Sequence, residues 1–382
     1  MKIRNNVDNI PHLELIESGI PIEVHHLLSY KRVTREEAYE LVGYKLSGWV
    51  VLFCDLKGNP YPRNDGKPFY RFKPDPEQFK GADAPKYLTP KGAGCRPYFS
   101  PLGTEERFIT CKKLFITEGE KKSDALTHYG FPCIGLSGVY GWIDRRSGES
   151  QPLPELEGFN WKNRQVFLVF DSDIVSKIEV LLALNSLCEF LKGKEAKVFI
   201  VLLPNELNGE KNGADDFLKR HGKNAFSDLV RIARPAFHYN SKKKKEVFTW
   251  EPEPTETHHI ALTASIVFQD FYAERSGIGT YRWEEKYWQK VKGKSKEEIL
   301  KPLHQWLDLM DFHKRSCSHI SSITGELLTR LSQETWDPTH LIAFSNGTLD
   351  LRQNKLSHRH NSKDFISFLF PFPFDRSAQC QT

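Results

Sequence analysis

Three short apolar runs dominate the middle of the chain, and each predicts a buried β-strand. They span residues 114–117, 166–170 and 198–203 and are rich in β-branched and aromatic residues. Helical patterns separate them, including apolar positions spaced three or four residues apart between 173 and 192. Strands that alternate with helices in this way are typical of a parallel sheet flanked by helices. Residues 111–235 are therefore predicted to form an α/β domain.

Acidic residues follow each of these runs. Glu118 ends the first run, Asp171 and Asp173 follow the second, and Asp215 follows the third after a polar loop. Since the functional crevice of such a sheet lies outside the carboxyl ends of its strands, all these acids are expected at one edge. Two carboxylates about 4 Å apart repel by roughly 4 kcal/mol at an effective dielectric near 20. Without a compensating cation the converging acids would have to take up protons or splay apart.

The type of cation follows from the ligands available. Mg²⁺ (or Mn²⁺) prefers oxygen ligands and typically binds carboxylates together with substrate phosphates. No His or Cys accompanies the predicted acidic cluster, which argues against zinc. The pattern therefore predicts a magnesium-dependent phosphoryl-transfer site. The alternative is a purely structural role, in which the acids only cap the amino ends of helices.

The amino-terminal part has two predicted regions. Residues 1–48 are predicted to be a helical arm, with a capping box that begins at Thr34. Residues 49–110 begin with a predicted strand, and basic and aromatic residues then alternate in a loop-rich stretch. Because cationic groups neutralise phosphate and aromatic rings stack on bases, this basic α+β region is predicted to bind single-stranded nucleic acid. A solvated basic face over a small aromatic core is the alternative.

The carboxy-terminal part follows a predicted linker at 236–257, where a lysine run precedes a Pro- and Glu-rich stretch. Residues 258–382 are then predicted to form a mostly helical domain. Helical patterns cover 260–274 and 296–309, and residues 341–351 predict a β-hairpin with Asn-Gly at its turn.

Composition narrows the class of protein. With 382 residues and 39% hydrophobic content, the chain can form two or three globular domains. Its seven cysteines include no C-x-x-C pair, which argues against a zinc ribbon or a disulfide framework and favours the cytoplasm. No apolar stretch suits a signal peptide or a membrane span, so no membrane partner is expected. The net charge of +5 permits nucleic-acid binding without requiring it.

The absence of one motif and the presence of another narrow the possible reactions. No G-x-x-x-x-G-K-[ST] sequence occurs, so the chain has no recognisable ATPase motor. The D-x-D formed by Asp171 and Asp173, with Val175 after it, also fits phosphatases of the haloacid-dehalogenase type. Those enzymes carry the motif on their first strand, whereas here the strand that ends in Glu118 comes earlier.

The order of the acidic motifs is more specific than any one of them. A strand ending in Glu118-Gly119, a strand ending in Asp171-x-Asp173, and the segment 213–216 (Gly-Ala-Asp-Asp) resemble the TOPRIM domain of primases, topoisomerases and some nucleases. Residues 344–351 and the Tyr/Trp stretch before them are similar to the helical domain that precedes the superfamily 3 helicase of phage and plasmid primase-helicases. The two resemblances cover about residues 49–382.

The resemblance implies a DNA primase-type nucleotidyltransferase. Such enzymes make primers from nucleoside triphosphates on single-stranded DNA, here during replication of a phage, plasmid or integrated element. Glu118 would be the acid/base for the 3′-hydroxyl, and Asp171 and Asp173 would hold Mg²⁺ against the triphosphate. Asp215 would be an outer or second-metal ligand. Basic residues would hold template or nucleotide, namely Arg71, Lys86, Lys91, Arg96, Lys121 and Lys122.

Departures from the family pattern keep other functions open. Lys122 stands where many primases have an acid, and neither a zinc module nor a helicase motif is found. These features favour a replication adaptor that binds DNA and is catalytically weak. A TOPRIM nuclease, which uses the same acids, is a third interpretation. A motor would come from a separate replicative helicase or from a longer gene product.

Overall fold

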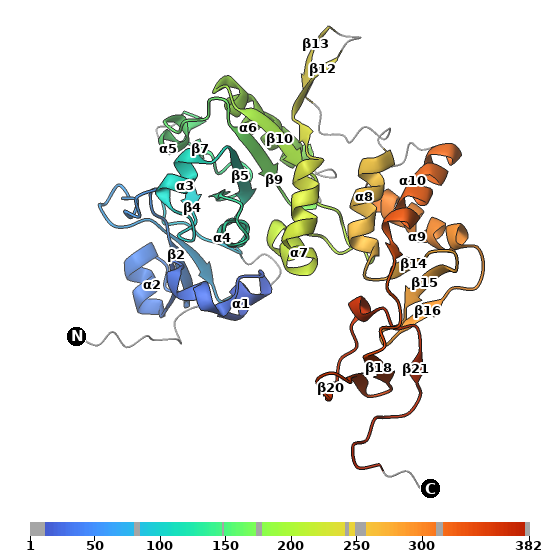
Figure 1. The fold of residues 1–382 in the computed structure, drawn as a ribbon. Coiled ribbons are helices and arrows are strands. Elements are labelled where there is room, and N and C mark those ends of the chain that lie inside the picture. The colour runs from blue at the N-terminus through green and yellow to red at the C-terminus, as the bar shows by residue number, and fades with distance from the viewer. Residues whose placement is uncertain are drawn as a thin grey trace, which may run out of the picture. The chain divides into compact units, whose positions relative to one another are not determined.

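The chain has a mixed α/β fold with two compact units, Met1–Leu203 with Lys211–Pro252 and Pro204–Glu210 with Glu253–Thr382 (Figure 1). The computed structural model describes residues 12–79, 85–146, 149–172, 178–240, 244–248, 257–310 and 316–378. None of the helices described in these ranges combines the length and the apolar character that a membrane span requires.

A six-stranded sheet with the order β11-β10-β9-β5-β6-β4 forms the centre of the first unit. Its strands are β4 (Tyr98–Phe99), β5 (Lys113–Glu118), β6 (Cys133–Leu136), β9 (Gln165–Val169), β10 (Lys197–Val201) and β11 (Arg234–Pro235). The four inner strands are parallel, and each edge strand is antiparallel to its neighbour. This confirms the predicted parallel sheet, since all three apolar runs are inner strands.

Three phenylalanines fix the register of the inner strands. Phe115, Phe167 and Phe199 are directly opposite one another on β5, β9 and β10. Their rings stack at centroid distances of 5.1 and 5.0 Å. A slip by one residue would move these side chains to the other face, so the row aligns the carboxyl ends of β5 and β9.

Helices surround this sheet, as Figure 1 shows. They are α3 (Glu105–Thr110), α4 (Glu120–His128), α5 (Pro154–Glu157), α6 (Ile178–Gly193) and α7 (Ala214–Arg231). Helix α7 is interrupted at Gly222, whose φ of 79° divides it into two shorter helices. The β7–β8 hairpin pairs Ile143–Asp144 with Gln151–Pro152.

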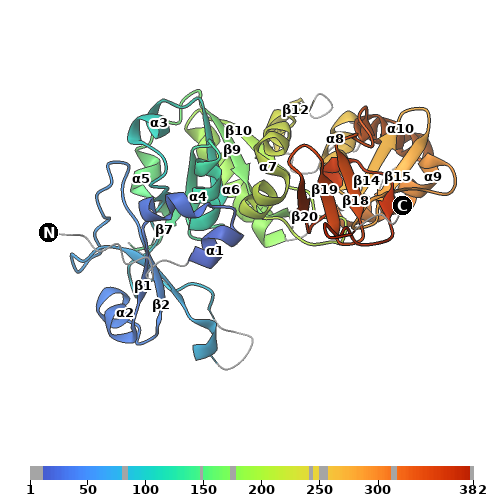
Figure 2. The ribbon, with the colours of Figure 1, turned by 60° about the horizontal axis from the view of Figure 1, so that its bottom comes forward.

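A three-stranded antiparallel sheet, in the order β1-β2-β3, precedes the α/β part. It contains β1 (Tyr30–Val33), β2 (Gly48–Leu52) and β3 (Tyr70–Pro74), with α1 (His12–Glu17), η2 (Ile22–Leu27), α2 (Arg35–Val42) and η3 (Pro76–Gln78) nearby. Helix α2 packs on this sheet (Figure 2), and its predicted capping box at Thr34 is confirmed. The prediction of a separate helical arm over 1–48 is wrong for β1, because this four-residue strand pairs with β2.

A second hairpin lies within the predicted linker. Strand β12 (Phe237–Asn240) pairs with β13 (Lys245–Phe248), so this part of 236–257 has regular structure. Residues 241–243 and 249–256 lie outside the described ranges.

The second unit combines three helices with two four-stranded sheets in the part that the structure describes. The helices are α8 (Thr257–Phe268), α9 (Ser295–Leu309) and α10 (Cys317–Arg330). The first sheet, in the order β16-β15-β14-β17, contains β14 (Tyr272–Arg275), β15 (Gly279–Trp283), β16 (Trp288–Lys290) and β17 (Ser332–Gln333). The second, in the order β20-β19-β18-β21, contains β18 (Leu341–Phe344), β19 (Gly347–Asp350), β20 (Lys355–Ser357) and β21 (Leu369–Phe370), with η5 (Ser362–Asp364) before β21.

These sheets correct the prediction of a mostly helical domain. The helix expected over 260–274 ends at Phe268, because residues from Tyr272 onward pair with β15. The hairpin expected at 341–351 is confirmed, since β18 pairs with β19. Its two turn residues are Ser345 and Asn346, and Gly347 already belongs to β19.

A buried acid links the three-stranded and six-stranded sheets of the first unit. Asp124 of α4 accepts hydrogen bonds from Tyr30 of β1 at 2.7 Å and from Tyr98 of β4 at 3.0 Å. Burial raises the pKa of Asp124 to about 7, against the hydrogen bonds of its hydroxyl partners, which lower it. Asp124 is therefore part of the framework and does not face the acidic edge.

The elevated pKa of Asp124 predicts that stability depends on pH. Between about pH 4, where an unfolded Asp titrates, and pH 7, the folded state holds an extra proton, so the free energy of unfolding falls as pH rises. The contribution of this one group is at most about 1.4 kcal/mol per pH unit. We expect urea denaturation at a series of pH values to show that the free energy of unfolding declines less steeply with pH for Asp124→Asn than for the unaltered protein. Equal slopes for the two proteins would contradict this assignment.

Candidate active site

The sheet brings the predicted acids to one edge. Glu118 is the last residue of β5, and Asp171 lies just beyond the end of β9, the strand paired with β5 in parallel. Asp215 lies in the first turn of α7. Asp173 falls outside the described residues.

Lys122 lies among these three acids. Its ammonium forms an ion pair with Asp171. Burial lowers the pKa of Lys122, but the charges of Asp171, Asp215 and Glu118 outweigh this effect, and the pKa is above its ordinary value. Lys122 is therefore a cation held by carboxylates. It was predicted to bind nucleic acid, and the structure instead places it inside the acidic cluster.

The turn between β5 and α4 explains this position. Gly119 has a φ of 98°, which glycine adopts without strain, and α4 starts at the next residue. Side chains in a helix tilt toward its amino end, so Lys122 points back over the end of the sheet. This short spacing after Glu118 was the signal in the sequence that could have placed Lys122 in the cluster.

Asp215 is an acid of this edge whose hydrogen bonding is incomplete. Its side chain is buried, with 6% of its surface exposed. Burial raises its pKa, and the charge of Lys122 and a hydrogen bond from Ser18 only partly oppose this. Within the described residues, the Oδ1 atom of Asp215 has no hydrogen-bond partner. The site thus contains a buried acceptor that a donor or a cation could satisfy.

These residues fit a metal ion only in part. Asp171 and Asp215 offer carboxylate oxygens, which Mg²⁺ prefers. In the part of the chain that the structure describes, no three His, Cys, Asp or Glu side chains are grouped closely enough to hold a metal. Lys122 interacts with the same carboxylates that an ion would use. The predicted role of Glu118, Asp171, Asp173 and Asp215 as metal ligands therefore stays a prediction.

Two of the basic residues that were predicted to bind nucleic acid form ion pairs with acidic residues of the same unit. Arg71 of β3 donates to the buried Glu120 at 2.5 Å and stacks over the ring of Tyr87, 4.5 Å from its centroid. Lys121 forms an ion pair with Glu14 at 3.2 Å. These pairs connect β3 and α1 to the first turn of α4 and so support the acidic edge from one side.

Arg96 is buried, which corrects its predicted role at a nucleic-acid surface. Its guanidinium donates to the backbone oxygens of Cys95 at 2.8 Å and Pro62 at 3.3 Å, and it lies 3.6 Å from Glu155. Buried loop carbonyls need donors, and the five N–H groups of arginine supply them. Arg96 thus holds loops together.

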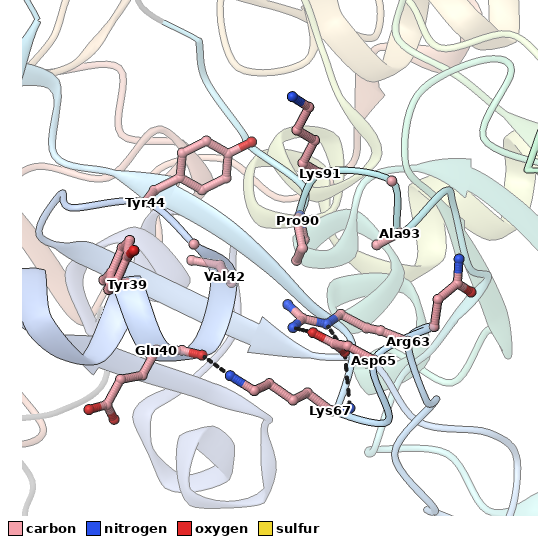
Figure 3. A pocket seen from close by; sticks show the side chains of 13 residues that line it. Tyr39, Glu40, Val42, Tyr44, Arg63, Asp65, Lys67, Pro90, Lys91 and Ala93 are labelled. Atoms are coloured by element: carbon pink, nitrogen blue, oxygen red, sulfur yellow. Dashed lines mark hydrogen bonds and ion pairs between the residues drawn. The ribbon is translucent and has the colours of Figure 1, made fainter.

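Lys86 and Lys91, the other two predicted contacts, are exposed. Lys91 lines a cavity of about 720 Å³ beside the end of α2 (Figure 3). Two cations in this cavity have structural partners, since Arg63 donates to the Leu41 oxygen and Lys67 to the Glu40 oxygen. They satisfy carbonyls at the carboxyl end of α2. Lys86 and Lys91 therefore remain as the candidates for phosphate contacts.

Comparison with known families matches two segments. Residues 110–225 match a domain of unknown function, and residues 267–382 match the family described as D5 N terminal like. An uncharacterized protein of Picosynechococcus sp. is 24% identical over 186 residues, which are 44% of this chain. The chain spans 18% of the length of that relative.

Solved structures with some similarity include primases. The Aquifex aeolicus primase (zinc-binding and RNA polymerase domains) is 12% identical with a TM-score of 0.39, covering 83% of this chain and 66% of that one. A DNA primase domain from Pseudomonas aeruginosa is 13% identical with a TM-score of 0.41, covering 82% and 91%. The DnaG catalytic domain bound to single-stranded DNA is 15% identical with a TM-score of 0.39, covering 61% and 74%.

Gly213 provides a test of the geometry around Lys122. A Cβ atom on this residue would lie 2.7 Å from Oδ1 of Asp215 and 2.8 Å from Cε of Lys122. We expect Gly213→Ala to lower the free energy of unfolding by about 1 kcal/mol, the low end of the usual cost of overpacking, because the Lys122 side chain can shift.

Gly193→Ala is the matched control, because no heavy atom lies within 4 Å of its added Cβ. Thermal or urea denaturation should show no loss of stability for this variant, and a gain of up to about 1 kcal/mol is expected because alanine is the better helix former. If both variants are equally stable, Lys122 does not lie over Gly213.

Proposed function

We propose that this chain is the nucleotidyltransferase part of a primase-type replication protein of a phage, plasmid or integrated element. It would join nucleoside triphosphates into primers on single-stranded DNA. The observation that carries the proposal is the convergence of Glu118, Asp171 and Asp215 on the Lys122 ammonium at the carboxyl edge of a parallel sheet. Carboxylates from separate strands and helices meet there, as a phosphoryl-transfer site needs.

Two further features support the proposal. The acidic motifs occur in the order of a TOPRIM domain, and the parallel strands β5 and β9 carry them. The segment that matches the D5 N terminal like family lies within the part of the sequence that is similar to the domain before the helicase of primase-helicases. A separate replicative helicase is the partner that this arrangement suggests.

Each residue then has a role. Asp171, Asp173 and Asp215 would hold Mg²⁺ (or Mn²⁺), which would neutralise the triphosphate and orient it for in-line attack. Glu118, at the end of β5, would accept the proton of the attacking 3′-hydroxyl. Lys86 and Lys91 would hold template phosphates.

A second candidate is a replication adaptor that binds DNA and has weak catalytic activity. The ion pair between Lys122 and Asp171 favours it, because this lysine already neutralises a carboxylate that a metal would need. Such a protein would bind single-stranded DNA equally well after chelation of divalent ions.

Primer synthesis separates the two candidates. With labelled nucleotides, single-stranded DNA and Mg²⁺, we expect the full chain to make primers. Asp171→Asn and Glu118→Gln should each lose about 100-fold or more, since metal binding and proton transfer are removed. Asp228→Asn, which alters a half-buried acid on α7 that pairs with Arg231, should be as active as the unaltered protein.

The same reactions identify the alternatives. Full activity in Asp171→Asn would reject the proposed site. Absence of product from every variant, with DNA binding intact, would favour the adaptor, and nicked DNA with Mn²⁺ would indicate a nuclease.

Removal of the Lys86 and Lys91 charges should weaken DNA binding electrostatically. For the Lys86→Ala/Lys91→Ala variant we expect lower affinity and a smaller salt dependence, by about 0.7 in the log–log slope for each phosphate that is no longer neutralised. Fluorescence anisotropy of labelled single-stranded DNA across a KCl series measures both quantities.

Lys162→Ala/Lys194→Ala is the control with the same change in charge. These lysines pair with Glu195 and Glu157 elsewhere on the first unit. If the two double variants bind DNA alike, Lys86 and Lys91 only contribute to net charge.

A further inference from the structure

Lys122 occupies an unfavourable position for a cation. It lies in the first turn of α4, where the partial positive charge of the helix end repels ammonium groups. Its side chain is only 20% exposed, although burial of a charge is costly. Carboxylates must therefore hold it there. The ion pair with Asp171 and the charges of Asp215 and Glu118 supply this attraction.

The same lysine leaves the cluster incompletely neutralised. Three carboxyl groups share one ammonium at this edge. The buried Oδ1 of Asp215 still has no hydrogen-bond partner in the described part of the chain. One ammonium is a single point charge with three donors, whereas a divalent ion can bind oxygens of several carboxylates at once.

We propose that Lys122 is a resident counter-ion that competes with a divalent metal for Asp171 and Asp215. In the metal-free protein the ammonium neutralises Asp171. When a divalent ion binds these carboxylates, the ammonium leaves them, because two cations would repel each other strongly at this distance. The inference rests on the metal site of the proposed function and adds a residue that sets its affinity.

Access to solvent makes this exchange feasible. The side chain of Asp171 is 40% exposed, so an ion can approach it from solvent. The lysine side chain is long, and its Cε lies over Gly213, a residue without a side chain. The ammonium can therefore rotate outward while the backbone of α4 stays in place. Freed in this way, it lies at the edge where the triphosphate of a nucleotide would bind.

Binding of Mn²⁺ to the full chain tests the competition directly. The free ion is measured by electron paramagnetic resonance during titration of the unaltered protein, Lys122→Met and Lys121→Met. We expect Lys122→Met to bind Mn²⁺ about tenfold more tightly or better, because the competing charge is gone. Lys121→Met should raise the affinity much less, since Lys121 pairs with Glu14 and its charge acts on Asp215 less than that of Lys122. Adding Asp171→Asn to Lys122→Met should remove the tight binding.

The outcomes distinguish this inference from the proposed function. If the unaltered protein and Lys122→Met bind Mn²⁺ with equal affinity, the competition is overturned and the metal site remains. If neither protein binds Mn²⁺, the competition and the metal site are both overturned, and the primer assay alone decides about catalysis.

A second measurement needs no variant. Lys121 and Lys122 are neighbours with equal side-chain exposure of 20%, so each serves as the reference for the other. Acetic anhydride labelling followed by mass spectrometry should show that saturating Mn²⁺ raises modification of Lys122 relative to Lys121, at matched ionic strength. An unchanged ratio would overturn the proposed displacement.

Discussion

The ion pair between Lys122 and Asp171 is the interaction on which the acidic edge depends. Parallel pairing of β5 and β9 forces Glu118 and Asp171 toward the same edge, and the start of α7 adds Asp215. Carboxylates this close repel one another, and burial adds to the cost for Asp215. A cation from the chain offsets this repulsion at the point where the three segments meet, so the fold tolerates the convergence before any ligand binds.

Buried acids of the first unit are stabilised in three different ways. Asp124 accepts hydrogen bonds from hydroxyl groups, and its pKa rises to about 7. Glu120 pairs with the guanidinium of Arg71. Asp215 has a hydrogen bond from Ser18 and the charge of Lys122, yet one of its oxygens stays without a partner in the described part of the chain. The environment of Asp124 is complete, whereas Oε2 of Glu120 and Oδ1 of Asp215 each lack a hydrogen-bond partner in the described part of the chain. Asp215 differs from Glu120 in its place, since it acts on Lys122 together with Asp171 and Glu118, and this makes it the candidate ligand.

The elements that could be predicted from the sequence are those whose signals are local. The apolar runs identified β5, β9 and β10, and Thr34 marked the start of α2. Strand β1 was missed because only its pairing with β2, a non-local contact, makes four residues into a strand. The candidate site shows the same limit. The acids could be placed at strand ends, but the partners of Arg71 and Arg96 come from distant segments, so their burial was not visible in the sequence.

Lys122 also explains why the two candidate functions are hard to separate by motif alone. A catalytic site and an inactive one can share Glu118, Asp171 and Asp215, since in both cases the fold must neutralise the negative charge of these residues. The difference lies in how strongly the lysine is bound. The Asp171 carboxylate is 40% exposed, so solvent partly screens its ion pair with the ammonium. Under the proposed function a divalent ion would attract the same oxygens more strongly, and the lysine would yield to it; in the adaptor the lysine would keep its place.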